Sequence, residues 1–156
     1  MNPIQFEDFL KILTPLEKEL AGKINDLYLT NECKCDIKES ASGYTLSYIS
    51  LITKKTVANF VCRKTGLKIR LTPPKPFECD ELISNFPLNM KNDMIKAHDC
   101  LRLQGEDVCN PRCLMGYPFT LNNEKYSKCR SMAFLFSVTE ENFEHLIALS
   151  KKSLQN

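Results

Sequence analysis

The chain has 156 residues, of which 43% are hydrophobic and 26% are charged. This length and composition predict one folded domain over residues 1–156, because domains commonly hold about 100–150 residues. The 21 basic and 19 acidic side chains leave a formal charge of only +2, so the overall charge favours neither nucleic acid nor an anionic membrane surface as a partner. We therefore expect a protein or small-molecule ligand.

No stretch reaches the roughly 18 apolar residues of a membrane-spanning helix. The first residues, Met1 to Asp8, lack the basic and then apolar pattern of a secretory signal. We therefore expect a cytoplasmic protein, in which thiols stay reduced. Metal ligation and buried unpaired thiols are then the leading explanations of the eight cysteines.

The first 30 residues are predicted to be helical. The segment Thr14-Pro15-Leu16-Glu17 is typical of a helix start, with Thr as the N-cap and Glu three residues after it. Apolar residues then recur at helical spacing, which predicts a helix with one face in the core. These residues are Leu16, Leu20, Ile24 and Leu27.

From about residue 32 to residue 72 the hydrophobic period changes to two, which predicts β-strands. The segment Leu67–Leu71 is the clearest case, with apolar side chains on one face and basic side chains on the other. Short turn-like breaks between the runs favour an antiparallel meander. Pro73, Pro74 and Pro76 are expected to end it, with Cys79 in the loop that follows.

The remaining elements are expected to alternate between helix and strand. The pattern predicts a helix from Met90 to about Gly105, a hairpin over Tyr117–Lys128 that turns at Asn122-Asn123, a buried strand over Met132–Val138, and a last helix capped by Thr139 that frays from Lys151. This order indicates an α+β fold, with an antiparallel sheet of about five to seven strands and N-terminal, central and C-terminal helices packed on it.

Four cysteines gather in a Cys-rich subregion, residues 98–130, with the spacing C-x8-C-x3-C-x15-C. Tetrahedral zinc needs four donors, and each thiolate sulfur lies about 2.3 Å from the ion. Pro111 lies between two of the cysteines and favours a tight turn that would aim both thiolates the same way. We therefore predict a structural zinc site formed by Cys100, Cys109, Cys113 and Cys129.

Reduced unligated thiols, disulfides and an iron–sulfur cluster remain alternatives for this set. His98 is a substitute donor, but its place four residues after Met94 favours a packed or partly exposed histidine on the same helical face. Cys33 and Cys35 are expected on the same face of a strand, and Cys62 is expected to be a small core residue.

These patterns favour a non-catalytic binding or interaction domain, stabilised by the zinc site. No catalytic or nucleotide-binding motif is present, so no catalytic or cofactor-binding residue is predicted. The alternative is a small enzyme or redox protein that uses a reactive cysteine of the Cys109–Cys113 turn.

A third hypothesis is a nucleic-acid binder, because basic residues and tyrosines on one side of the meander would make a stacking platform. The nearly neutral chain and the missing RNA-binding signature favour a solvated strand face instead. The residues concerned are Lys54, Lys55, Arg63, Lys64, Lys68 and Arg70, with Tyr44 and Tyr48 nearby.

The C-terminal half resembles small uncharacterised bacterial Cys-rich α+β proteins of unknown function, mainly over residues 90–140. The residues that carry the resemblance are Asp99-Cys100, Cys109-Asn110-Pro111-Arg112-Cys113, Gly116-Tyr117-Pro118-Phe119-Thr120, Lys128-Cys129-Arg130 and Ala133-Phe134-Leu135-Phe136. Such proteins share a helix with a cysteine, a Cys-rich loop, a hairpin and a closing cysteine. The resemblance implies that the four cysteines act as a set, and it implies no activity.

Overall fold

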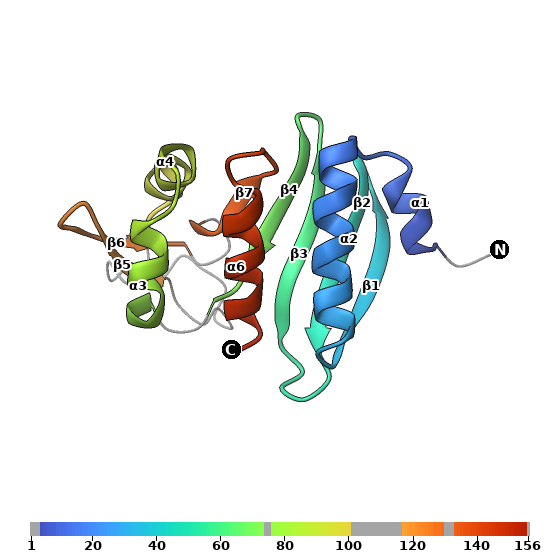
Figure 1. Ribbon diagram of the computed structural model, residues 1–156, viewed down its shortest axis with the longest axis horizontal. Helices are drawn as coiled ribbons and strands as arrows, with labels where there is room; N and C mark the ends of the chain where they lie inside the picture. The colour runs from blue at the N-terminus through green and yellow to red at the C-terminus, as the bar shows by residue number, and fades with distance from the viewer. Residues whose placement is uncertain (1–3, 74–75, 101–116, 130–132, 156) are drawn as a thin grey trace.

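The chain forms a five-stranded antiparallel sheet with helices on one side, and a separate two-stranded hairpin (Figure 1). The computed structural model describes residues 4–73, 76–100, 117–129 and 133–155. The predicted α+β class is confirmed. The described elements are α1 (Phe6–Leu10), α2 (Pro15–Leu29), β1 (Cys33–Ser40), β2 (Gly43–Ser50), β3 (Thr56–Arg63), β4 (Gly66–Leu71), α3 (Pro76–Ser84), α4 (Leu88–Lys96), β5 (Tyr117–Leu121), β6 (Glu124–Lys128), β7 (Leu135–Ser137) and α6 (Phe143–Ser153).

The strand order in the large sheet is β1-β2-β3-β4-β7. The first four strands form the predicted meander, and β7 returns late in the chain to pair with β4. Glycines begin β2 and β4 with positive φ angles, 135° at Gly43 and 122° at Gly66. A Cβ atom on Gly43 would lie 2.7 Å from Cδ1 of Ile12, the movable end of an exposed side chain, so the positive φ is the main obstacle to a larger residue there.

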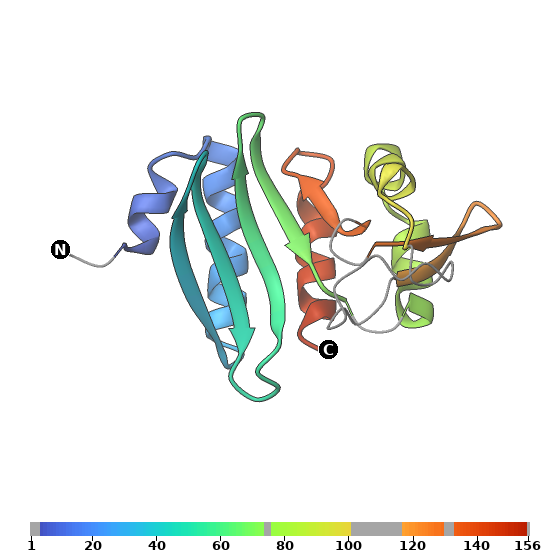
Figure 2. The same cartoon turned by 180° about the vertical axis from the view of Figure 1, so that it is seen from behind.

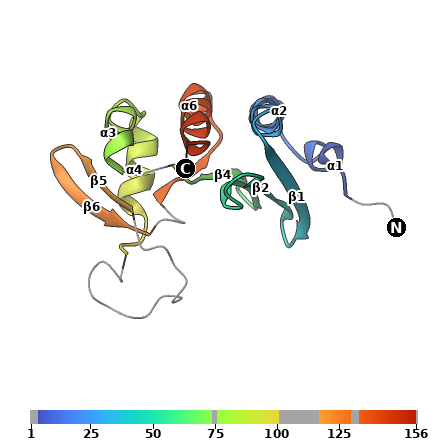
Figure 3. The same ribbon diagram turned by 90° about the horizontal axis from the view of Figure 1, so that it is seen from below.

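Alternation gives the large sheet two different faces. In β4, Leu67, Ile69 and Leu71 are buried, while Lys68 and Arg70 on the other side are half-buried, as predicted for this segment. Helices α1, α2 and α6 lie on the buried side of this sheet, whereas α3 and α4 lie beside it, next to the β5–β6 hairpin (Figure 3). Seen from behind, strands β1 to β4 lie in front of α2 with no described helix over them (Figure 2). We call this second side the open face.

A column of aromatic rings fills the core between α1, α2 and the sheet. Phe9 stacks on Phe60 with ring centroids 5.8 Å apart, Phe60 meets Tyr48 at 5.2 Å, and Tyr48 meets Tyr28 at 5.0 Å. All four side chains are fully buried. The Tyr48 hydroxyl donates to the Asn25 side chain at 2.7 Å, so this buried polar group has a partner.

Helix α2 begins as the sequence predicts. The Thr14 hydroxyl accepts a hydrogen bond from the Glu17 backbone, and the Glu17 carboxylate accepts one from the Thr14 backbone at 2.9 Å. The second Glu17 oxygen accepts from the Leu67 backbone N–H, also at 2.9 Å. One carboxylate therefore caps α2 and fixes its start against β4.

Helices α2 and α6 are joined by a buried hydrogen bond. The Tyr28 and Ser153 hydroxyls lie 2.6 Å apart, and Ser153 donates to the Ser150 carbonyl at 2.7 Å. The prediction that the chain frays from Lys151 is therefore wrong, because the last turn of α6 is fastened to α2. The helix also starts later than predicted: its N-cap is Asn142, whose backbone N–H donates to the Thr139 hydroxyl.

Two central elements also differ from the sequence prediction. Helix α3 spans a segment predicted to be a loop, so Cys79 lies on a helix. Pro76 is its first residue, where proline costs no hydrogen bond. Helix α4 ends at Lys96, earlier than predicted, because Ala97 adopts an extended conformation. None of the described helices is both long and apolar enough to cross a lipid bilayer.

Replacing Tyr28 by Phe should lower the free energy of unfolding by about 1 kcal/mol, because the buried Ser150 and Ser153 groups lose a partner. Tyr44→Phe is the matched control, since no described residue forms a hydrogen bond with the hydroxyl of this half-buried tyrosine. Urea unfolding followed by circular dichroism measures both changes. Equal losses in the two variants would contradict a role for the α2–α6 hydrogen bond.

Candidate functional site

The Cys-rich subregion is organised by a short third strand beside the β5–β6 hairpin. Asp99 and Lys128 face each other as an isolated antiparallel bridge. The Cys100 backbone N–H donates to the Ser127 carbonyl at 2.9 Å, and the Cys129 N–H donates to the His98 carbonyl at 2.6 Å. Residues 98–100 therefore pair with the edge of β6 that faces away from β5.

The hairpin itself turns where the sequence predicts. Asn122 and Asn123 have φ angles of 53° and 65°, which suit a two-residue turn that asparagine tolerates. The hairpin is held on one face by the rings of Phe119 and Tyr126, stacked with centroids 5.6 Å apart. Phe119 is buried, and β5 packs against α3.

Cys100 and Cys129, the first and last cysteines of the predicted set, come together through this pairing. Cys100 lies opposite Ser127 and Cys129 lies opposite His98, so strand alternation places both cysteines on the same face. They occupy diagonal positions, for which Cα atoms are typically about 7–8 Å apart. Cys100 is buried and Cys129 is half-buried. Cys109 and Cys113 lie outside the described residues.

His98 is not placed as the sequence predicted. It lies beyond the end of α4 in the strand segment and is exposed, whereas Met94 is fully buried in the helix. Its position opposite Cys129 puts it on the same face as both cysteines. His98 is therefore better placed as a substitute donor than its helical spacing indicated.

The opposite face of the strand segment carries an ion pair. Lys128 Nζ lies 2.8 Å from Asp99 Oδ1, and the lysine side chain is only 9% exposed while that of Asp99 is 53% exposed. The same ammonium lies 5.5 Å from the centre of the Tyr126 ring. This buried cation depends on its carboxylate, because a charge inside a protein is costly without a partner.

Arg70 connects the Cys-rich subregion to the large sheet. Its burial, and then the nearby cation of Arg63, lower the pKa of the Arg70 guanidinium, while Cys129 acts in the opposite direction. Arg70 belongs to β4 and lies opposite Leu135 of β7. Cys129 is therefore within electrostatic range of the large sheet.

The remaining described cysteines lie elsewhere in the fold. Cys33 and Cys35 point to the helix-covered face of β1, and Cys62 is a buried core residue of β3, as predicted. Burial raises the pKa of the Cys33 and Cys35 thiols. Within the described ranges, no three side chains of His, Cys, Asp or Glu gather as they would around a metal ion.

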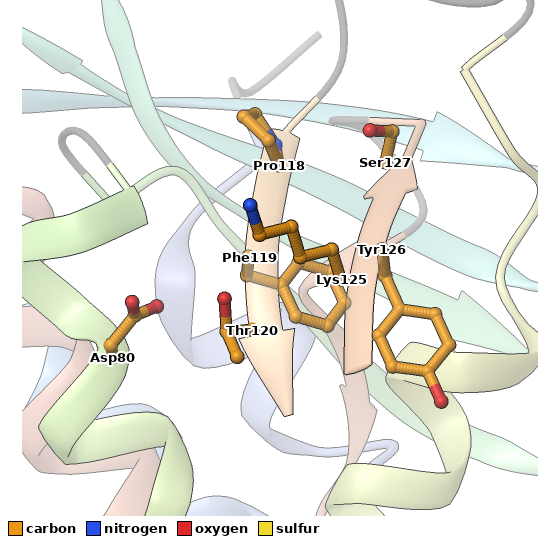
Figure 4. Close-up of a pocket in the computed structure, with 7 residues that line it drawn as sticks. All are labelled: Asp80, Pro118, Phe119, Thr120, Lys125, Tyr126 and Ser127. Atoms are coloured by element: carbon orange, nitrogen blue, oxygen red, sulfur yellow. The ribbon is translucent and has the colours of Figure 1, made fainter. Parts of the chain in front are cut away.

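A pocket of about 350 Å³ lies between α3 and the hairpin (Figure 4). Asp80 reaches into this region from α3 and faces Thr120 of β5, and one of its carboxylate oxygens is buried without a hydrogen-bond partner. The Lys125 side chain extends across the hairpin, and the Tyr126 hydroxyl points away from Asp80. The lining offers apolar contacts and one hydrogen-bond acceptor. Thr120 and Lys125 are exposed, so this pocket is open to solvent on their side.

No protein-family model matches the chain, and comparisons with curated proteins and with solved structures found no similar protein. The resemblance to small bacterial Cys-rich proteins therefore stays a prediction. What the chain binds has to be inferred from its own geometry.

Asp99→Asn should lower the free energy of unfolding by about 1–2 kcal/mol, because it leaves the Lys128 ammonium buried with a neutral acceptor. Lys128→Met should lower the free energy of unfolding by less, since it removes the buried charge itself and leaves the half-exposed Asp99 to be solvated by water. Urea unfolding of both variants provides the comparison. A larger loss for Lys128→Met would show that the ammonium itself stabilises the hairpin.

Alkylation of Cys33 and Cys35 by iodoacetamide should be slow near neutral pH. The raised pKa means that each thiol stays protonated to a higher pH than an ordinary cysteine, and only the thiolate reacts. Mass spectrometry of peptides labelled at a series of pH values gives the midpoint for each residue, with the same chain in urea as the control. A native midpoint at or below the value in urea would contradict this assignment.

Proposed function

We propose that the chain is a non-catalytic binding domain whose C-terminal segment is stabilised by a structural zinc ion bound to Cys100, Cys109, Cys113 and Cys129. The observation that carries the proposal is the meeting of Cys100 and Cys129 on paired strands, although they lie far apart in the sequence. Two of the four predicted ligands thus start from neighbouring backbone positions on one face.

Diagonal positions on paired strands suit two ligands of one tetrahedral ion. Sulfurs bound at about 2.3 Å from zinc lie close to 4 Å from each other, and cysteine side chains can turn towards a shared point from Cα atoms about 7–8 Å apart. Cys109 and Cys113 would complete the site from the segment between α4 and β5. With four thiolates the coordination is full, so the ion contributes folding energy and leaves no open position for a substrate.

The hairpin gives a physical reason for such an ion. Strands β5 and β6 have five residues each, and an isolated two-stranded hairpin of this size is marginally stable. The packing of Phe119 and the Asp99–Lys128 ion pair anchor one face. Zinc on the face that carries the cysteines would anchor the other.

Protein purified without chelator should contain about one equivalent of zinc, because structural sites are normally filled. Elemental analysis should find zinc in place of iron, and Cys100→Ser and Cys129→Ser should each lower the zinc content by at least about half. The same substitutions should lower the unfolding temperature, as should treatment of the unmodified protein with EDTA.

Cys62→Ala is the matched control for these variants. Cys62 is buried in the large sheet and lies outside the proposed ligand set, so the variant should lose some stability through its core and should keep its zinc. Less than about a tenth of an equivalent of any metal in the unmodified protein would contradict the proposal. About two or four equivalents of iron, with as much acid-labile sulfide, would show an iron–sulfur cluster in place of zinc.

A further inference from the structure

The register of the large sheet gathers basic side chains on its open face. Strand alternation and the printed pairings place Lys34 and Lys38 of β1 there, together with Arg63 of β3 and Lys68 and Arg70 of β4. In sequence these residues are spread over three separate strands. Pairing across the sheet turns them into one surface.

The open face is much more positive than the chain as a whole. Among the residues of strands β1 to β4, this face carries those five cations and one carboxylate, Asp36, which gives a charge of +4 against +2 for the whole chain. The remainder of the chain therefore carries about −2 at neutral pH. This asymmetry is invisible in the overall composition, which had counted against a charged partner.

Carboxylates of the described part of the chain neutralise little of this charge. Lys38 and Arg63 are exposed and form no ion pair with a described residue. Lys34 approaches Asp36 only at 4.0 Å with both side chains about half exposed, and such pairs contribute little. Lys68 donates to the Ser137 hydroxyl at 2.6 Å, which leaves its charge uncompensated.

The side chains between the charged residues are small, and two apolar residues lie next to cations. One row across the strands reads Lys38, Thr45, Val61, Lys68 and Ser137. The neighbouring row places a hydrogen-bonded Ser47–Asn59 pair between Asp36 and Arg70, and ends at Leu135. Val61 and Leu135, next to the cations, are half-buried.

The same register excludes the stacking platform considered from the sequence. Tyr48 is fully buried on the helix-covered face, and Tyr44 packs edge-on against Phe9 with centroids 6.5 Å apart. No aromatic side chain of β1 to β4 or β7 lies on the open face in the described register. Single-stranded nucleic acid binders rely on such rings, so the face is poorly suited to that partner.

We propose that the open face binds an acidic segment of a partner protein. Cations next to the half-buried apolar side chains Val61 and Leu135 match a segment in which carboxylates alternate with apolar residues, since a protein interface combines apolar contacts with a charged rim. The row from Lys38 to Lys68 crosses four strands, about 14 Å at the usual strand spacing, which an extended segment of roughly five residues spans. This inference names the partner of the proposed binding domain.

The test uses the full chain as purified without chelator, and a short fluorescein-labelled peptide of Glu, Ala and Leu. Fluorescence anisotropy at low salt should show saturable binding that weakens as salt rises, because the attraction is electrostatic. A peptide with Gln in place of every Glu should bind at least roughly tenfold more weakly. A duplex DNA oligonucleotide of equal charge serves as the competing macromolecule.

The decisive comparison is between two double charge reversals. Lys38→Glu with Arg63→Glu changes the open face, and the binding constant for the acidic peptide should fall roughly tenfold or more. Lys18→Glu with Lys151→Glu makes the same change in net charge on exposed residues of α2 and α6, and binding should change less than about twofold.

Equal losses in the two double variants would overturn the inference, because net charge alone would then explain the attraction. Tighter binding of the DNA than of the acidic peptide would overturn it as well, and would make the open face a nucleic-acid surface. Zinc content is measured on the same preparations. Full zinc without peptide binding rejects this partner alone, whereas missing zinc rejects the proposed zinc site independently of the peptide result.

Discussion

The packing of α1, α2 and α6 on one side of the large sheet depends on the aromatic column from Phe9 to Tyr28. These rings occupy the space between the sheet and the helices α1 and α2, and the Tyr28 hydroxyl carries the contact on to Ser153 of α6. Because the helices share this one apolar layer, the other side of the sheet keeps the polar half of each alternating strand. The open face is therefore a direct result of how the core is filled, since a strand cannot bury both of its faces without a second layer.

The hairpin obeys a different constraint. Its strands are too short to form a core of their own, and they depend on α3 on one side and on residues 98–100 on their edge. The pairing of these residues with β6 determines which side chains share a face: the Asp99–Lys128 ion pair lies on one side, and Cys100 and Cys129 lie on the other. A shift of one residue in this pairing would put Asp99 on the face of Cys129 and Cys100 on the face of Lys128. The ion pair and the proposed ligands of zinc therefore depend on the same backbone hydrogen bonds.

The parts of the fold that local chemistry determines could be predicted from the sequence. Thr14 and Glu17 mark the start of α2, the alternating strands give the meander, and Asn122-Asn123 marks the hairpin turn. The errors arose where distant partners decide the structure. Ala97 leaves the helical conformation because the residues after it pair with β6, although the sequence predicts a continuing helix. Ser153 is held by its hydrogen bond with Tyr28, although its polar segment predicts a fraying end.

The same limit applies to the candidate surfaces. The spacing of Cys100 and Cys129 only predicts that they belong to one set, and strand pairing is what places them on one face. In the same way, only the register separates Arg63 and Lys68 from Tyr44 and Tyr48.

The two edges of the large sheet are unequal, and this has a consequence for solubility. Strand β7 ends one side with three residues, whereas β1 borders the other with eight, and an edge strand of that length exposes backbone groups that can recruit a strand from another molecule. Lys34, Asp36 and Lys38 recur at every second position along β1, so two such edges would bring like charges together on approach. These side chains thereby discourage edge-to-edge aggregation, and they would keep that protective effect even in a chain that has no ligand bound.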